Sequence, residues 1–476
     1  MSKSSRTRAL AAIVLAALPA CRRAPEVRTP DWQPEMARKA DRWLQDPDIR
    51  LLQDYVRIPT VDPPGNERPG AEFLKSYLDC EGVPSELICP EQDRCNLYAR
   101  IKGKDSHRSL LLLNHIDVVP VYRPEWTEDP FGGAIKQSYL YGRGSYDMKS
   151  TGIAQIVAFA ELAKSGIIPE RDVVFLAECG EEFEWKDGVR WIFEHRPDVL
   201  AEVDGVLNEG GITEVVAGFP RYYGIEIAQG GQAYALLSSD REEDLKPAEK
   251  FKPLGMYQAP EPGVQRFLNE VAEFRAPYFA NAFRHPWLVK DPEVRKWIPV
   301  QNLSLITGGA MFTGPFPAQR LPGYPAVGKF DSAIMVSLPV GVPAGPTLDR
   351  LIAENLRPGV RVIHREESPV TACSPFDTAD IRALRRVLAA TNPGVPVIPI
   401  VNAFAETTSA EFRARGIPAY GFTPFQMDPV DSARRHGNDE RLFLPFFTRG
   451  MTLMREVLFE IATEQEWSTR NPGIAK

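Results

Sequence analysis

A set of acidic and imidazole side chains occurs at points where buried strands or loops would end. Most follow apolar runs typical of buried strands, and the set is His115, Asp117, Asp147, Glu181, Glu182, Glu209 and His436. Charged groups are seldom fully buried unless they are paired or bind a metal. Clustered carboxylates repel one another, which raises their pKa values, unless divalent cations neutralise them. Imidazole and carboxylate ligands suit Zn²⁺, so these residue types indicate a metal site.

The spacing gives neighbouring side chains different directions. His115 and Asp117 are two apart in a predicted strand, so their side chains share a face and Asp117 can accept the second ring N–H of His115. Glu181 and Glu182 are adjacent and can point differently, which suits one general base and one ligand. Each piece alone is more often structural or a solvated surface. The ordered set favours two metals that activate water and polarise a carbonyl together.

Alternating strands and helices must position these groups. The predicted buried strands are RSLLLLNHIDVVP, RDVVFLAECG and EVDGVLNEGG. Residues 147–166 predict a helix, with Asp147 at its N-cap position and Gly166 at its end. This alternation predicts an α/β fold with a mixed, largely parallel sheet flanked by helices. Ligands bind beyond the carboxyl ends of such strands, so we expect the groups to converge there.

The chain of 476 residues divides into five predicted segments. Residues 1–21 form a signal peptide, 22–40 a polar tether, 41–214 and 366–476 the two parts of a catalytic domain, and 215–365 an inserted smaller α+β lid domain. The net charge of -7 argues against nucleic acid as a partner.

The N-terminus has the features of an exported protein. Basic residues precede the run ALAAIVLAALPA, which is too short to span a bilayer, and Cys21 follows at once. LPAC resembles a bacterial lipoprotein processing site, so we expect a periplasmic protein or one anchored to the membrane through lipidated Cys21. Plain secretion is the alternative, and a cytosolic chain is less favoured. Export permits disulfides, and Cys89 with Cys95 is the favoured local pair.

The ordered motifs resemble those of a known family. NHIDVVP, EWTEDPFGG…LYGRGSYDMKS, GEE, NEGG and HGNDE look like successive motifs of the M20 metallopeptidases, which include glutamate carboxypeptidase-like enzymes, aminoacylases and succinyl-diaminopimelate desuccinylase. The resemblance implies a zinc-exopeptidase-like fold and a peptide or N-acyl amino acid substrate. It also implies two Zn²⁺ ions per chain, with Co²⁺ or Mn²⁺ as alternatives.

The resemblance also implies a role for each metal ligand. Asp147 would bridge the two metals. His115 and Glu209 would complete one site, and Glu182 and His436 would complete the other.

Further motif residues would serve the reaction or the loop. Glu181 would be the general base that takes a proton from water, and Asp117 would support His115. The peptide bond after Asp147 would be cis. For Arg143 and Lys149 we favour a role in packing the loop.

The inserted segment departs from the family pattern. Family members place a histidine there, which reaches across a dimer to stabilise the oxyanion, but YALLSSDREEDLKP has none. His285 and His364 lie elsewhere in the sequence, and we expect neither to play that part. MVSLPVG stands where the family has an arginine that holds the substrate carboxylate, and the TDAR-like loop reads TSAEF. Substrate class and homodimer formation therefore stay open.

The sequence predicts an exported dizinc hydrolase that cleaves an amide or peptide bond. An N-acyl amino acid amidohydrolase is the alternative. Many dipeptidases of the family carry Asp at the position of Glu209, so Glu209 favours this alternative or a carboxypeptidase. A non-catalytic, metal-containing binding lipoprotein is the third hypothesis. The intact Glu181 speaks against it, since a binding protein has no need of a base.

Overall fold

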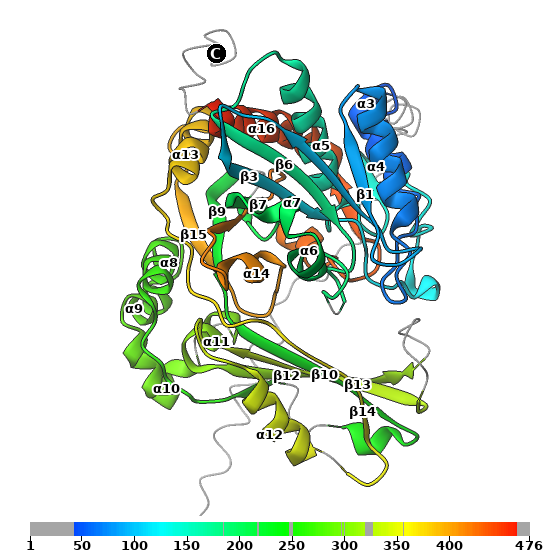
Figure 1. The fold of residues 1–476 in the computed structure, drawn as a ribbon. Helices are drawn as coiled ribbons and strands as arrows, with labels where there is room; N and C mark the ends of the chain where they lie inside the picture. Colours follow the sequence, from blue (N-terminus) through cyan, green and yellow to red (C-terminus); the bar gives the residue numbers. More distant parts are fainter. Residues whose placement is uncertain are drawn as a thin grey trace, which may run out of the picture.

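The computed structural model describes residues 42–463, apart from 184, 217–218, 247–250, 297, 299, 319–326 and 356. The predicted signal peptide, the tether and Cys21 lie outside the described residues. A large sheet with helices on both faces lies above a smaller sheet in the view of Figure 1.

The large sheet carries the strands that were predicted from the apolar runs. Its strands are β1 (Ser85–Ile88), β2 (Asn96–Ile101), β3 (Asp105–His115), β6 (Arg171–Glu178), β7 (Val203–Asn208), β8 (Thr213–Val216), β9 (Phe219–Gln229), β15 (Val397–Asn402) and β16 (Ala419–Gly421). They run in the order β1-β2-β6-β3-β7-β16-β9-β15, and β8 pairs with β9. The pairs β6–β3, β3–β7, β7–β16 and β9–β15 are parallel, which confirms the predicted mixed, largely parallel sheet.

Helices cover both faces of this sheet. One face carries α3 (Pro47–Val56), α4 (Arg68–Cys80), α5 (Lys149–Lys164), α13 (Ala379–Thr391) and α16 (Leu444–Thr463), and the other carries α6 (Val189–His195), α7 (Pro197–Leu200) and α14 (Ser409–Arg413). In β3, Leu110 and Leu112 pack towards the first group, whereas Leu111 and Leu113 pack towards the second. Burial on both faces explains the continuous apolar run of β3.

The smaller sheet forms the inserted lid. Its strands are β10 (Gly231–Ser239), β11 (Phe251–Pro253), β12 (Gly309–Pro317), β13 (Phe330–Leu338) and β14 (Arg361–Glu367), in the order β11-β12-β13-β10-β14. The helix α12 (Gly345–Asn355) packs on one face of β10, through Leu348 and Leu351 against Ala233 and Ala235. The other face of β10 is turned away from α12, because side chains alternate along a strand.

Part of the segment 215–365 lies with the large sheet. β9 pairs with β15 and β16 and is buried along most of its length, and α8 (Pro262–Ala272) packs against β15. The segment continues through α9 (Pro277–Arg284), α10 (Pro292–Arg295) and α11 (Val300–Thr307). The many prolines of this segment indicate loops and helix starts. They do not reveal that β9 pairs with strands of the large sheet.

A third sheet supports the loops near the large sheet. It consists of β4 (Ala134–Lys136), β5 (Tyr139–Tyr141) and β17 (Arg441–Phe443), in the order β17-β5-β4. The short helix α15 (Pro429–Ser432) precedes β17 in the chain. This sheet joins two distant segments, so the loops before α5 and before β17 are held near each other.

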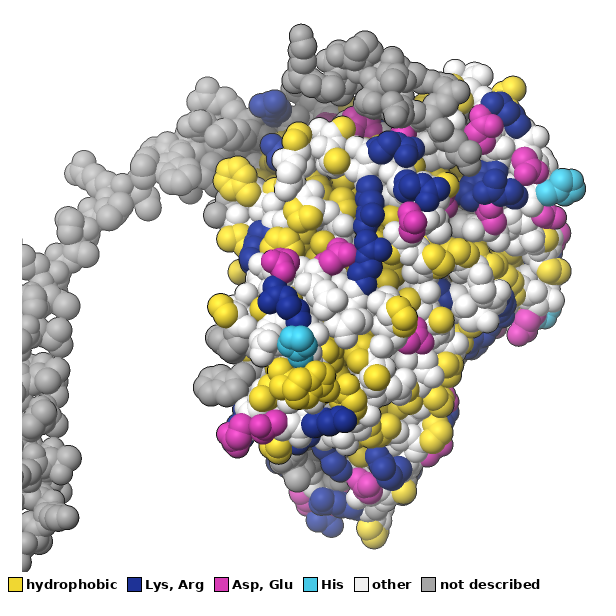
Figure 2. All heavy atoms as spheres, turned by 90° about the vertical axis from the view of Figure 1, so that its left-hand side faces the viewer, with side chains coloured by type: hydrophobic (Ala, Val, Ile, Leu, Met, Phe, Trp, Pro, Cys, Tyr) yellow, Lys and Arg dark blue, Asp and Glu magenta, His cyan; other side chains and the backbone are white. Residues whose placement is uncertain are grey.

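The surface mixes side-chain types. Figure 2 shows basic, acidic and hydrophobic side chains interspersed over the face that carries α8 and α9. Within the described part of the chain, no helix is long and apolar enough to cross a membrane.

Candidate active site

The predicted site residues come together at the carboxyl edge of the parallel strands. His115 is the last residue of β3, the pair Glu181 and Glu182 follows β6, and Glu209 directly follows β7. The loop before α5 contributes Asp147, and the loop between α15 and β17 contributes His436.

The five predicted metal ligands form two groups that share one carboxylate. His115 Nε2 lies 3.3 Å from Asp147 Oδ1 and 3.4 Å from Glu209 Oε1. His436 Nε2 lies 3.1 Å from Asp147 Oδ2 and 3.2 Å from Glu182 Oε2. Asp147 therefore presents one oxygen to each imidazole. This is the grouping that the family resemblance implies, and the ligand roles themselves stay predictions.

The charges of this site are out of balance. Burial alone would lower the pKa of His115, but Asp147 and Glu209 hold it well above its usual range. Burial also opposes protonation of His436, yet Glu182 and Asp147 raise its pKa to about 10. Burial and the charge of Asp147 raise the pKa of Glu209 to about 7. Positive charge would stabilise these carboxylates. The two imidazoles supply it only when they are protonated.

The donor set fits a pair of divalent cations. Each group offers one imidazole nitrogen and two carboxylate oxygens, and the ligand atoms of each group lie within 4.8 Å of one another. Glu182 Oε1 and Glu181 Oε1 are buried and have no hydrogen-bond partner among the described residues. Imidazole and carboxylate donors in this number suit Zn²⁺. His115, Glu182, Glu209 and His436, with the shared Asp147, would hold the two ions.

The ring of His115 is oriented by a main-chain group. Its Nδ1–H donates to the carbonyl oxygen of Asp117 at 2.9 Å, whereas the Asp117 carboxylate lies 3.7 Å away. We expected the carboxylate to be the acceptor. Instead, Asp117 Oδ2 accepts a hydrogen bond from the backbone N–H of Glu182 at 2.7 Å. Because this carbonyl binds Nδ1, the Nε2 atom of His115 points towards the carboxylates of Asp147 and Glu209. The Asp117 side chain instead positions the turn that contains Glu181 and Glu182.

The loop that presents Asp147 is organised by Glu440, which sequence reasoning missed. The buried Glu440 carboxylate accepts hydrogen bonds from the backbone N–H groups of Gly144, Tyr146 and Asp147, at 2.9 to 3.1 Å. It also accepts one from Arg143 Nη1 at 2.6 Å. Glu440 stands four residues after His436 within the HGNDE motif, and that proximity was the available signal.

The start of α5 differs from the prediction. The helix begins at Lys149, with Met148 at its N-cap position, and Asp147 does not cap it. The Asp147 carboxylate faces the two imidazoles instead, and the peptide bond between Asp147 and Met148 is cis. The ammonium of Lys149 donates to the carbonyl oxygens of Tyr55 and Ile58, at 3.1 and 2.6 Å, which agrees with a packing role.

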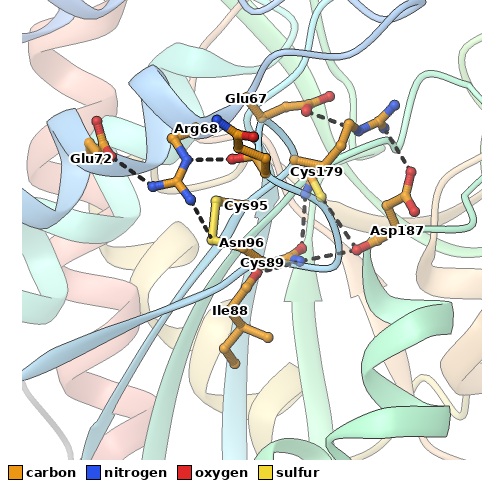
Figure 3. Close-up of a disulfide and its surroundings, with 11 residues drawn as sticks. Glu67, Arg68, Glu72, Ile88, Cys89, Cys95, Asn96, Cys179 and Asp187 are labelled. Carbon is orange, nitrogen blue, oxygen red and sulfur yellow. Dashed lines mark hydrogen bonds and ion pairs between the residues drawn. A yellow bond between two sulfur atoms is a disulfide. The ribbon is translucent and has the colours of Figure 1, made fainter.

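The segment that carries Glu181, the predicted general base, is held by Asn96, which directly follows a disulfide-closed loop. The disulfide Cys89–Cys95 is present as predicted, and Asn96 follows it directly. As Figure 3 shows, Asn96 lies beside Cys179 and Asp187. The backbone N–H of Cys179 donates to Asn96 Oδ1 at 3.0 Å, and Asn96 Nδ2 donates to the carbonyl of Asp187 at 3.0 Å. Cys179 and Asp187, on either side of Glu181, are therefore both fixed to Asn96 at the start of β2.

Gly180 brings Glu181 into place. Its φ of +71° lies in the left-handed region, and a Cβ there would meet Arg94 Nη2 at 2.4 Å. Glu181 follows with a side chain that is 6% exposed. Burial, reinforced by the nearby carboxylates, raises the pKa of Glu181 well above its usual value. A carboxylate with a raised pKa is suited to accept a proton and return it.

A cavity of about 230 Å³ lies between this site and the lid. Its lining includes Glu181, several proposed ligands and Arg435, which sequence reasoning did not single out. Arg435 Nε lies 3.8 Å from Asp147 Oδ2. From the lid, Gln232 and Tyr234 line the cavity, and His364 Nε2 lies 3.1 Å from the Tyr234 hydroxyl.

The arrangement belongs to the class of metal-dependent hydrolases. A model of peptidase family M20/M25/M40 matches residues 111–460. The chain therefore belongs to this family, and the resemblance recognised in the motifs is confirmed.

Relatives and solved structures agree with this assignment. Human aminoacylase-1 is 24% identical over 432 residues, which cover 88% of this chain and 96% of that protein. Succinyl-diaminopimelate desuccinylase of Dinoroseobacter shibae is 38% identical over 153 residues, covering 30% of this chain and 37% of that protein.

Two solved structures share the fold over almost their whole length. An M20 metallo-carboxypeptidase from Sulfolobus solfataricus aligns with a TM-score of 0.61 at 17% identity, covering 88% of this chain and 99% of that chain. A di-peptidase from Saccharomyces cerevisiae aligns with a TM-score of 0.64 at 16% identity, covering 90% and 98%. The predicted fold class, with its lid, is confirmed.

Proposed function

We propose that this chain is an exported hydrolase that uses two divalent cations, Zn²⁺ foremost, to cleave an amide or peptide bond. The observation that carries the proposal is Asp147, whose two oxygens face two separate imidazole–carboxylate groups beside the buried Glu181. A purely structural cluster would have no need of an additional carboxylate on the cavity wall.

The residues of this chain divide the chemical work. When bound, the two cations would polarise the scissile carbonyl and lower the pKa of water. Glu181 accepts the proton of the attacking water and returns it to the leaving nitrogen. Glu440 holds the Asp147 loop in its position, and the Asp117 carboxylate holds the turn that carries Glu181.

The substrate is either an N-acyl amino acid or a peptide. Similarity to human aminoacylase-1 over 88% of the chain supports an N-acyl amino acid amidohydrolase. The structural likeness to a metallo-carboxypeptidase and a di-peptidase concerns the fold alone, and it is compatible with a peptidase. A non-catalytic binding lipoprotein is less favoured, because the base is retained.

Export through a lipidated Cys21 is part of the proposal and rests on the N-terminal sequence. Labelling of cells with a fatty-acid analogue should mark the wild-type chain and leave Cys21→Ser unmarked. Equal labelling of both would contradict the anchor.

The test of the mechanism is hydrolysis of a panel of dipeptides and N-acyl amino acids by the metal-loaded protein. We expect Glu181→Gln to lower kcat by about 10² to 10⁴-fold, the usual range for loss of a general base. Its metal content should equal that of the wild type. Glu354→Gln, on the far side of the lid in α12, is the matched control and should keep full activity. Equal rates for wild type and Glu181→Gln would sink the assigned mechanism.

A further inference from the structure

The two ends of the cavity carry different charged groups. At the end formed by the proposed metal ligands lies Arg435, whose guanidinium faces Asp147. Towards the lid, the cavity is lined by Glu366 and Glu406. Glu366 belongs to β14 and Glu406 to the loop after β15, and neither is a proposed metal ligand. The acidic end is therefore a separate feature of the same cavity.

The strand register builds the roof of the cavity. Tyr234 of β10 pairs with Met335 of β13 and with Glu366 of β14, so the three form a row across the lid sheet. All three line the cavity. Since Ala233 and Ala235 pack against α12, the Tyr234 side chain is on the opposite face of the sheet. The sheet thus presents the Glu366 carboxylate towards the substrate space.

A second carboxylate reaches the same end from the large sheet. Glu406 lies in the loop after β15, and Gln232 Nε2 ties that loop to the lid by donating to the carbonyl of Ala405 at 2.7 Å. Burial, and then the charge of Glu366, raise the pKa of Glu406 to about 8. A cation placed between the two carboxyl groups would relieve this repulsion and favour the charged form of Glu406.

The positive charge that the chain provides there is already shared. Arg190 Nη1 lies 3.2 Å from Glu366, and Arg190 Nε lies 2.9 Å from Glu411. Arg190 therefore pairs with both Glu366 and Glu411. Arg415 Nη1 also lies 2.7 Å from Glu411, and His364 Nε2 lies 3.8 Å from Glu366, so the basic groups of this region are already engaged with carboxylates.

Aromatic rings complete the lining, from Phe183, Trp185, Tyr234 and Phe404. The faces of such rings attract cations, most strongly where water is excluded. We propose that this end of the cavity binds a positively charged group of the substrate, either its free α-ammonium or a basic side chain. The inference rests on the proposed function, because the cavity opens onto Glu181. The buried Glu181 Oε1, which has no hydrogen-bond partner in the described part of the chain, marks where the rest of the substrate lies.

Matched substrates separate charge from shape. Nα-acetyl-L-lysine is compared with Nα-acetyl-L-norleucine, which has the same side-chain length without the ammonium. L-Leucyl-L-alanine is compared with 4-methylpentanoyl-L-alanine, which lacks only the α-ammonium. In one arm at least, we expect the charged member to be preferred by about tenfold in kcat/KM, the range for a partly desolvated cation among carboxylates and rings. The arm that responds identifies the source of the charge.

Variants then test whether the acidic end causes the preference. Glu406→Gln should reduce the preference to about threefold or less, since one of two carboxylates is removed. Glu354→Gln is the control and should leave the preference unchanged. Equal or faster hydrolysis of the neutral member in both arms, or a preference that survives Glu406→Gln, would overturn the inference.

Failure of the proposed function has a different signature. It would appear as no hydrolysis of any member of the panel. Calorimetry with the Glu181→Gln variant measures the binding affinity of the same four compounds in the absence of turnover, and so tests the acidic end alone. The charged members should bind about tenfold more tightly, and equal binding of charged and neutral members would refute the subsite.

Discussion

Two clusters of carboxylates lie close together in this protein, and they obtain positive charge in different ways. In the first, Asp147, Glu182 and Glu209 surround the two imidazoles at the edge of the sheet. In the second, Asp62 and Glu67 approach Asp117 with ligand atoms within 4.8 Å. Judged only by how close their ligand atoms lie, both clusters would be candidate metal sites.

The second cluster is neutralised by the chain itself. Arg94 lies 2.9 Å from Asp62, 3.1 Å from Glu67 and 3.5 Å from Asp187. Burial and the charge of Asp117 raise the pKa values of Asp62 to about 7 and of Glu67 to about 9, which shows how costly further negative charge is there. A resident guanidinium makes this a structural cluster. The first cluster has imidazoles in that place, and imidazoles ligate metals when they are neutral.

The largest expected effect comes from breaking the shared ligand of the first cluster. Asp147→Asn removes the carboxylate that both groups use, so kcat/KM should fall by about 10³-fold, a loss of several kcal/mol of charge stabilisation. The bound metal should also decrease. Asp62→Asn, in the second cluster, is the matched control, and this variant should bind as much metal as the wild-type chain. If both variants lose metal equally, the distinction between the clusters fails.

The second cluster should matter for stability instead. Arg94→Met leaves three carboxylates buried without their cation, and removal of one partner of a buried ion pair costs about 3–5 kcal/mol. Denaturant unfolding should show this loss in the free energy of unfolding. Arg94→Lys keeps the charge and should lose less. A change below about 1 kcal/mol in Arg94→Met, the usual value of a surface pair, would contradict the structural role.

The smallest effect should come from Asp117, which lies between the clusters. Because its main-chain carbonyl orients His115, Asp117→Ala should retain its metal while kcat/KM falls by about tenfold, as is typical when a supporting group is lost. The reason for the lower rate is the lost hydrogen bond to the backbone of Glu182. Loss of metal in this variant as complete as in His115→Ala would show that the carboxylate, rather than the carbonyl, controls the histidine.

The sequence was sufficient where a local pattern determines the outcome. The apolar runs predicted β3, β6 and β7, and their carboxyl ends placed His115 and Glu209 at one edge. It was insufficient where a distant segment decides. The local sequence could not distinguish Asp147 from a helix cap, and only the family resemblance implied its bridging role, because its partners are His115 and His436, which is 289 positions away in the chain.

The same limit applies to supporting contacts. Nothing local shows that Glu440 binds the 143–147 loop, or that the carbonyl of Asp117 reaches His115 before its carboxylate does. The position of β9 in the large sheet depends on its pairing with β15, about 170 residues later.

Metal stoichiometry tests the central claim most directly. Wild type, His115→Ala and His436→Ala are loaded with Zn²⁺, dialysed and measured by mass spectrometry of the metal, with circular dichroism to confirm folding. The account predicts about two ions per folded wild-type chain and about one in each variant, because each imidazole serves one of two sites. One ion or none in the wild type, or two in both variants, would contradict the two-metal site.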